Sequence, residues 1–144
     1  MKMHSNFKRC CLVFIVALSC AVCMAVVNEA WRRQKIMNGV YNLKILGQAM
    51  LEYSEQNDSL PVDDLGNILF HKIHIPMKKL KKTASPDIFS CKGIDGNYDD
   101  KKKPLAVGYT EMYYDPFTMK RYQIQMIIEA DGSVRTRKIS KTTP

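Results

Sequence analysis

Three oxygen-bearing side chains alternate in one short stretch of this chain. They are Asp95, Asn97 and Asp99, and Asp100 follows directly. Carboxylate and amide oxygens spaced in this way form the first half of a calcium-binding loop, where they converge on one hard cation. The glutamate that closes such a loop at its twelfth position is absent. Two interpretations therefore stay open: a calcium site and an ordinary Asp-Gly turn.

The other reactive side chains form no recognisable site. His71 and His74 have the spacing of two imidazoles on one helix face, but no third metal ligand lies near them in the sequence. Cys91 stands alone outside the amino-terminal region, and no motif supplies it with a base, so we expect a buried thiol. There is no Ser/His/Asp order and no glycine-rich phosphate loop. We therefore expect no enzyme, and no cofactor other than calcium.

The composition fits one modest domain with a basic surface. The chain has 144 residues, with 22 Lys or Arg against 14 Asp or Glu, and a formal net charge of +8. Basic residues cluster over residues 78–82 and 101–103, without the interleaved aromatic rings that stack on bases. We expect a solvated or phosphate-facing surface there, and no nucleic-acid partner.

One long helix, predicted over residues 10–57, must position these groups. Its first part, residues 10–27, carries no charge, and in a helix these 18 residues span about 27 Å, close to the hydrocarbon thickness of a bilayer. A short basic lead, residues 1–9, precedes it. Three interpretations of the apolar run stay open: an uncleaved anchor, a signal peptide cut after Ala25, and a lipoprotein modified at Cys20.

The second part of this helix is amphipathic. Its apolar residues recur every three or four positions: Ile36, Val40, Leu43, Leu46, Met50 and Tyr53. This stripe predicts a helix that packs against a sheet. The polar side of the same helix carries Lys35, Asn38, Asn42, Glu52 and Gln56. Turn formers after Asn57, followed by Pro61, predict the end of the helix.

The middle of the chain has little periodicity, and the carboxyl-terminal third predicts strands. Residues 63–73 read as a turn and a short helix, and residues 88–91 as a short strand or core plug. Residues 105–114 are rich in β-formers, and residues 122–129 alternate apolar and polar side chains. Five aromatic residues in this region form either a contact surface or part of the core: Tyr109, Tyr113, Tyr114, Phe117 and Tyr122.

The turn at residues 130–132 determines the register in which the last two predicted strands pair. A three-residue loop with Gly132 left-handed would pair Ile128 with Val134, whereas a two-residue loop would pair Ile128 with Arg135. The longer loop keeps charge off the core face, so we expect it.

The predicted fold is α+β, with about three antiparallel strands on one long helix. Residues 28–140 would form the head domain and residues 141–144 a frayed tail.

The helix also carries a family resemblance. The motifs are Arg32-Arg33, Asn42-Leu43-Lys44, Leu46-Gly47, Ala49-Met50, Tyr53, Asn57-Asp58 and Leu60-Pro61, with weaker matches at Phe89-Ser90-Cys91 and Asp131-Gly132-Ser133-Val134. This pattern resembles the type II secretion pseudopilins and other type IV pilin-like proteins. The chain lacks the usual prepilin cleavage motif of that group, because Asn6 replaces the glycine before Phe7 and no acidic residue occurs before Glu29.

The resemblance implies a pilin-like fold and a structural role. It implies a single-pass protein of the bacterial inner membrane with a periplasmic head. Its partners would be the membrane and other pilin-like subunits or secretion-complex proteins. Calcium loops near the carboxyl end occur in the same group. The alternative is a secreted or lipid-anchored periplasmic binding module without catalysis.

Overall fold

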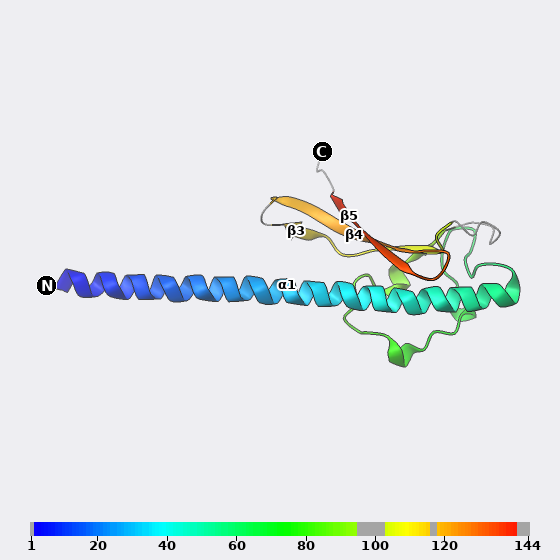
Figure 1. Cartoon of the computed structure of the whole chain (residues 1–144), viewed down its shortest axis with the longest axis horizontal. Coiled ribbons are helices and arrows are strands. Elements are labelled where there is room, and N and C mark those ends of the chain that lie inside the picture. The colour runs from blue at the N-terminus through cyan, green and yellow to red at the C-terminus, as the bar shows by residue number, and fades with distance from the viewer. Residues whose placement is uncertain (1, 95–102, 116–117, 141–144) are drawn as a thin grey trace. The chain divides into compact units, whose positions relative to one another are not determined.

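Two compact units make up the chain, Met1–Gln34 and Lys35–Pro144. The computed structural model describes residues 2–94, 103–115 and 118–140, with side chains from Arg9 onward. The first unit consists of helix, and the second contains a helix, a sheet and an irregular segment (Figure 1).

Helix α1, Lys2–Asn57, is the longest element and contributes to both units. No proline occurs before Pro61, so nothing interrupts its backbone hydrogen bonding. Its apolar run is exposed: Leu12, Phe14 and Met24 are 67%, 70% and 73% accessible. The helix is long and apolar enough to cross a membrane. A signal sequence passes the same test, so the anchored and cleaved alternatives both stay open.

Charge returns to α1 directly after the apolar run. Glu29 pairs with Arg32 and with Arg33, whose Nε lies 2.9 Å from Glu29 Oε1. The hydrogen bond from Arg32, and to a smaller extent the one from Arg33, hold the pKa of the Glu29 carboxyl below its usual value, although partial burial opposes this shift. Exposed pairs one helical turn apart contribute only a few tenths of a kcal/mol. They mark where α1 becomes polar rather than stabilise the fold.

The second unit contains a five-stranded antiparallel sheet. Its strands are β1 Lys92–Gly93, β2 Ala106–Tyr109, β3 Tyr113–Asp115, β4 Lys120–Ile128 and β5 Val134–Ser140. Strand β4 is central, because β2, β3 and β5 all pair with it. The α+β prediction is confirmed, but the sheet has five strands where about three were expected. The additional strands have only two or three residues, too few for an alternating pattern to reveal them.

The β4–β5 hairpin has the predicted register. Ile128 pairs with Val134 and Met126 with Thr136. Gly132 adopts a left-handed backbone with φ of 78°, and its amide donates to the Glu129 carbonyl at 2.9 Å. The three-residue loop is therefore confirmed, and it leaves the arginines of β5 exposed.

The core lies between the sheet and α1. Leu43, Leu46 and Met50 of the predicted stripe are fully buried, together with Met126 and Ile128 of β4. Burying each such side chain stabilises a fold by about 1.5–3 kcal/mol. The apolar stripe of α1 and the apolar face of β4 thus pack together in one hydrophobic cluster.

A second side of α1 is also covered, which the sequence did not predict. The middle of the irregular segment between α1 and β1, around Met77–Lys79, runs along the side of the helix opposite the sheet (Figure 1). Asn42, expected on the polar side, is only 3% exposed. Its Oδ1 accepts from the Lys81 amide and its Nδ2 donates to the Lys81 carbonyl, both at 2.9 Å. At Lys81 the backbone of the irregular segment therefore finds its polar partners on α1, as does the Ser85 amide, which donates to the Lys35 carbonyl.

The irregular segment contains three 3₁₀ turns: Phe70–Lys72, Met77–Lys79 and Ile88–Ser90. The helix predicted within residues 63–73 is thus wrong in type, because Val62 bridges Ile68 before a single 3₁₀ turn follows. The core plug at residues 88–91 is confirmed, since Ile88 and Cys91 are buried. The strand interpretation of the same residues is wrong, because Asp87 caps a 3₁₀ turn there.

Candidate functional site

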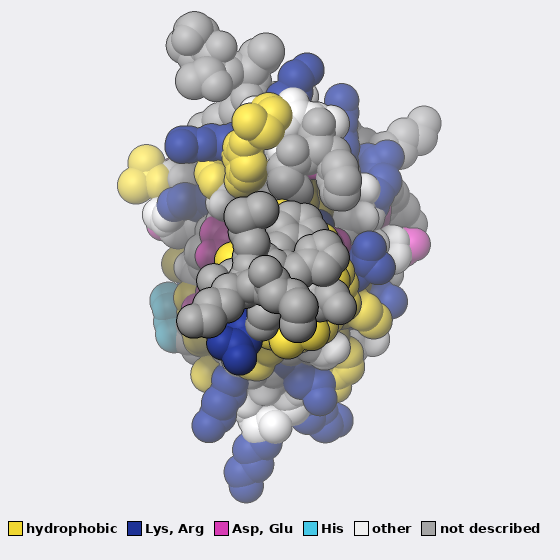
Figure 2. All heavy atoms as spheres, turned by 90° about the vertical axis from the view of Figure 1, so that its left-hand side faces the viewer, with side chains coloured by type: hydrophobic (Ala, Val, Ile, Leu, Met, Phe, Trp, Pro, Cys, Tyr) yellow, Lys and Arg dark blue, Asp and Glu magenta, His cyan; other side chains and the backbone are white. Residues whose placement is uncertain are grey.

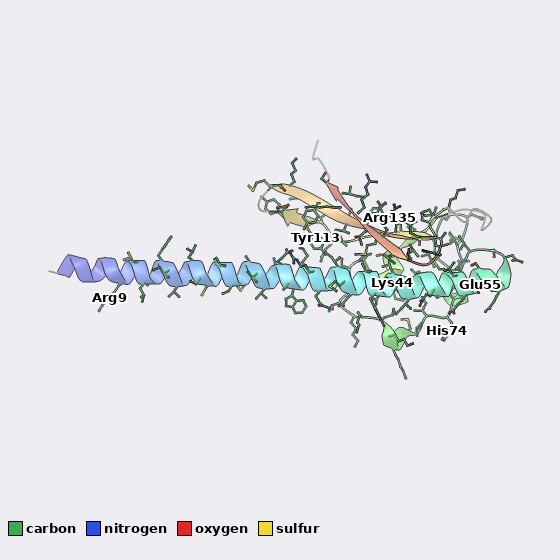
Figure 3. The ribbon with its side chains drawn as sticks, in the orientation of Figure 1. Arg9, Lys44, Glu55, His74, Tyr113 and Arg135 are labelled. Atoms are coloured by element: carbon green, nitrogen blue, oxygen red, sulfur yellow. The ribbon has the colours of Figure 1, made fainter. Side chains whose placement is uncertain are left out.

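The predicted metal ligands give no site in the part of the chain that the structure describes. Asp95, Asn97 and Asp99, the calcium candidates, lie outside the described residues. Among residues that are described, no group of three His, Cys, Asp or Glu side chains could hold a metal ion. His71 and His74 are both exposed, and His74 lies on the side of α1 opposite the sheet (Figure 3).

The Asp63 carboxylate has a structural role. Its Oδ1 accepts from the amides of Leu65 (3.0 Å) and Asn67 (2.7 Å), and its Oδ2 accepts from Asn67 Nδ2 at 2.9 Å. These hydrogen bonds, with the Asn67 side chain first, lower the pKa of the Asp63 carboxyl. Both oxygens close the turn at Gly66, whose φ is 74°. The carboxylate therefore organises a loop and has no arrangement for acid–base work.

Cys91 is buried, as expected. Its Sγ contacts the carbonyl oxygen of Asp87 at 3.6 Å. Burial, and to a smaller extent the charge of Asp87, raise the pKa of the thiol to about 12. A thiol that stays protonated and shielded from solvent is a poor nucleophile. Cys91 is a core side chain.

The aromatic residues of the sheet divide between its two faces. Tyr122 is buried, and Tyr113 packs on it with the ring centroids 5.8 Å apart. Tyr109 and Tyr114 are 46% and 52% exposed, and Phe117 lies outside the described residues. Because strand residues alternate between faces, the two exposed tyrosines lie on the side of the sheet that faces away from α1.

We call this side the outer face. It comprises Val107, Tyr109, Tyr114, Arg121, Gln123, Gln125, Ile127, Arg135, Arg137 and Ile139. Tyr114 pairs across strands with Arg121, and Gln125 stands between Tyr109 and Arg137. Gln125 Nε2 donates to the Tyr109 hydroxyl at 3.0 Å. Tyrosine and arginine on a flat surface are the residue types that protein interfaces favour.

The outer face is positively charged. Arg135 pairs with Glu129, its Nε lying 2.8 Å from Oε1, and Figure 3 shows Arg135 on the sheet. Arg121 and Arg137 are exposed. A signal for this face was present in the sequence, because the positions that alternate with the core residues of β4 and β5 are rich in Arg and Gln. Only the pairing with β2 and β3 adds the tyrosines to it.

The basic segment at residues 78–82 lies at the surface, as predicted. All four of its lysines are exposed, while Leu80 is half-buried. The Lys81 ammonium lies 5.5 Å from the ring centroid of Tyr41. The described residues thus offer three exposed features: the apolar run of α1, the outer face and this basic segment.

Comparison with known proteins adds no family. No protein-family model matches this chain, and no match occurs among curated proteins or solved structures. The function must therefore be inferred from the residues themselves.

Proposed function

We propose that this protein is a membrane-anchored, pilin-like structural and interaction protein. Its anchor would be residues 10–27, in the bacterial inner membrane, and its head would project into the periplasm. The head would contact other proteins, as a subunit of a secretion or pilus-like assembly, and would perform no catalysis.

The observation that carries the proposal is the composition of α1. One helix supplies an exposed, uncharged apolar run and, further along, the buried stripe of an α+β head. An apolar run that stays exposed among the described residues needs a bilayer or removal by a peptidase. The resemblance of the same helix to the pseudopilins, in its motifs from Arg32 to Pro61, supports the anchored alternative.

The decisive experiment is the intact mass of the native protein extracted from membranes, with its first residue identified. A chain that retains residues 10–27 supports the anchor. Methylation at Phe7 after removal of the residues before it would add filament-type processing. A chain beginning at Val26, or a diacylglycerol group on Cys20, would contradict the anchor and favour the secreted or lipid-anchored module.

The contact role has its own test. A photo-crosslinking amino acid at Tyr114, on the outer face, should give discrete protein adducts in living cells. The same amino acid at Leu65, which is 83% exposed and distant from the sheet in sequence, serves as the control. Equal adduct patterns at the two positions would argue against the outer face as a contact surface.

A further inference from the structure

A small cavity lies at one end of the sheet, on the face opposite to the outer face. Its volume is about 330 Å³, and its lining comes from Thr118, Lys120, Tyr122, Lys138 and Ser140. Tyr122 pairs with Ser140 across β4 and β5, and Lys138 pairs with Ile124. The lining residues of β4 and β5 therefore share one face of the sheet. None of the features discussed above uses this cavity.

Two lysines, Lys120 and Lys138, line this cavity together with Tyr122. The Lys138 ammonium lies 4.0 Å from the ring centroid, a cation–π contact that holds it in place. Lys120 is two residues before Tyr122 on the same strand, about 7 Å away along the backbone, so the two residues lie on the same face of the sheet. The hydroxyls of Thr118 and Ser140 complete the lining.

The charge of the cavity is only partly balanced. Asp115 lies beside it, and its Oδ2 is 3.5 Å from the Lys138 ammonium. The other oxygen of Asp115 accepts from the Thr118 amide at 3.3 Å. The Lys120 ammonium forms no ion pair or hydrogen bond within the described residues. The lining thus includes one ammonium without an acidic partner, together with two hydroxyls.

We propose that this cavity binds the phosphate group of a phosphate ester or of free phosphate. Ammonium groups bind phosphate as point charges, and each hydroxyl can donate to a further phosphate oxygen. The cavity volume lies at the lower end of the range for small-molecule sites. It therefore leaves room for a small group, such as glycerol, attached to the phosphate.

The position of the cavity suggests one source of phosphate. Lys35, the first residue of the second unit, pairs with Glu111 at 3.2 Å, and β3 begins two residues later. Tyr113 of β3 packs on Tyr122. The cavity thus lies at the end of the second unit where the chain continues toward the apolar run. In the view of Figure 2, Lys and Arg side chains are far more numerous than acidic ones.

Lipid headgroups and free phosphate are the two sources to separate. The first rests on the proposed anchor, whereas binding of free phosphate does not. The test uses the full chain in a non-ionic detergent, with backbone amide resonances followed by NMR while inorganic phosphate or glycerol phosphate is added. A parallel experiment places the chain in nanodiscs of phosphatidylcholine, alone or mixed equally with phosphatidylglycerol.

The variants are Lys120→Gln, which removes an exposed ammonium, and the double variant Lys120→Gln with Lys138→Gln. Lys44→Gln removes the same charge from the exposed side of α1 and is the matched control. We expect phosphate to shift the resonances of Tyr122, Lys138 and Ser140 in the unaltered chain. Loss of one charged hydrogen bond should weaken binding at least about tenfold in Lys120→Gln, and Lys44→Gln should leave it unchanged.

Each result has a definite meaning. Shifts with free phosphate that Lys120→Gln weakens support a phosphate site, whether or not the anchor is correct. Shifts that occur only with phosphatidylglycerol, and that Lys120→Gln weakens, support the site and assign it to lipid. The absence of shifts in both experiments overturns the proposal. Equal weakening by Lys120→Gln and Lys44→Gln also overturns it, because the binding would then follow net charge alone.

Discussion

Asn42 joins α1 to the irregular segment that crosses it. Its side-chain amide satisfies both the N–H and the C=O of Lys81. Replacing it by alanine leaves two partly buried backbone groups without partners, and a buried unsatisfied group costs about 1–3 kcal/mol. We therefore expect Asn42→Ala to lower the free energy of unfolding by about 2 kcal/mol or more. Denaturant unfolding of the full chain in detergent measures this change.

Asn38 offers the control for that variant. It lies one turn earlier on α1 and donates to Thr83 Oγ1 at 3.1 Å, but in an exposed setting. Water can replace that contact, so Asn38→Ala should cost less than about 1 kcal/mol. Similar losses in the two variants would show that helix propensity, and not the contact with Lys81, accounts for the effect.

Cys91 should be unreactive in the folded protein. An ordinary thiol with a pKa of 9.0 is about one-tenth ionised at pH 8, but a pKa of about 12 leaves roughly a thousandfold less thiolate. Alkylation of Cys91 by iodoacetamide, followed by peptide mass spectrometry, should therefore be at least a hundredfold slower in the folded chain than in guanidinium. Equal rates in the two conditions would contradict its burial.

The same thiol predicts a pH dependence. Its folded pKa is raised, so its contribution to stability is complete below pH 9.0 and is lost as the pH rises toward about 12. Cys91→Ala should flatten the fall in unfolding free energy over this range. An unchanged slope in that variant would assign the alkaline loss to other groups.

At the scale of elements, Gly39 sets how closely α1 approaches the irregular segment. A Cβ at this position would lie 2.3 Å from the carbonyl oxygen of Ser85, which is backbone and cannot rotate away. Alanine would gain up to about 1 kcal/mol in helix propensity, but overpacking costs about 1–3 kcal/mol. We expect Gly39→Ala to be destabilising by about 1–2 kcal/mol in thermal or denaturant unfolding.

Gln48 provides the comparison for Gly39. It is exposed on the same helix, so Gln48→Ala tests helix propensity without a steric change and should alter stability by less than about 0.5 kcal/mol. A stabilising effect of Gly39→Ala would mean that the Ser85 loop yields, and that the close approach is not a constraint.

The elements that the sequence predicted well are those with local, repeated signals. The stripe from Ile36 to Tyr53 and the alternation along β4 each repeat often enough to identify a buried face. The Gly132 turn is fixed by backbone chemistry within a few residues. The irregular segment has no such repeat, because its backbone bonds to α1 through Asn42 and other distant partners. Pairing of this kind leaves no periodic pattern.

The candidate sites also divide into those that local sequence signals reveal and those that depend on the pairing of distant residues. Exposure of the apolar run and burial of Cys91 could be predicted, since each depends on the residue types alone. The tyrosines of the outer face and the phosphate cavity could not, because each requires knowing which strands neighbour β4. Tyr109 and Tyr114, for example, come together with arginines only through the register of β2 and β3. Nothing in the order of those residues along the chain fixes that register.

At the scale of the whole molecule, the two units depend on different surroundings. Among the described residues, the buried hydrophobic side chains, from Leu43 to Ile128, all belong to the second unit. The large apolar side chains of residues 10–27 are more than half exposed and add nothing to that core. Because the second unit forms its hydrophobic core from its own residues, it does not need the apolar run to fold. Residues 10–27, by contrast, need an apolar environment.

Removing residues 1–27 should therefore separate the two properties. We expect the chain beginning at Asn28 to unfold within about 0.5 kcal/mol of the full chain when both are measured in the same detergent. In cells the full chain should stay with membranes after an alkaline carbonate wash, while the shortened chain, exported by a cleavable signal, should be released.

The matched control is the full chain with Leu43→Ala, which creates a core cavity costing about 2–5 kcal/mol but keeps the apolar run. That variant should be less stable to unfolding but should stay with the membranes after the carbonate wash. A shortened chain that cannot fold would contradict the independence of the head, and one that remains with membranes would place the membrane contact in the head itself.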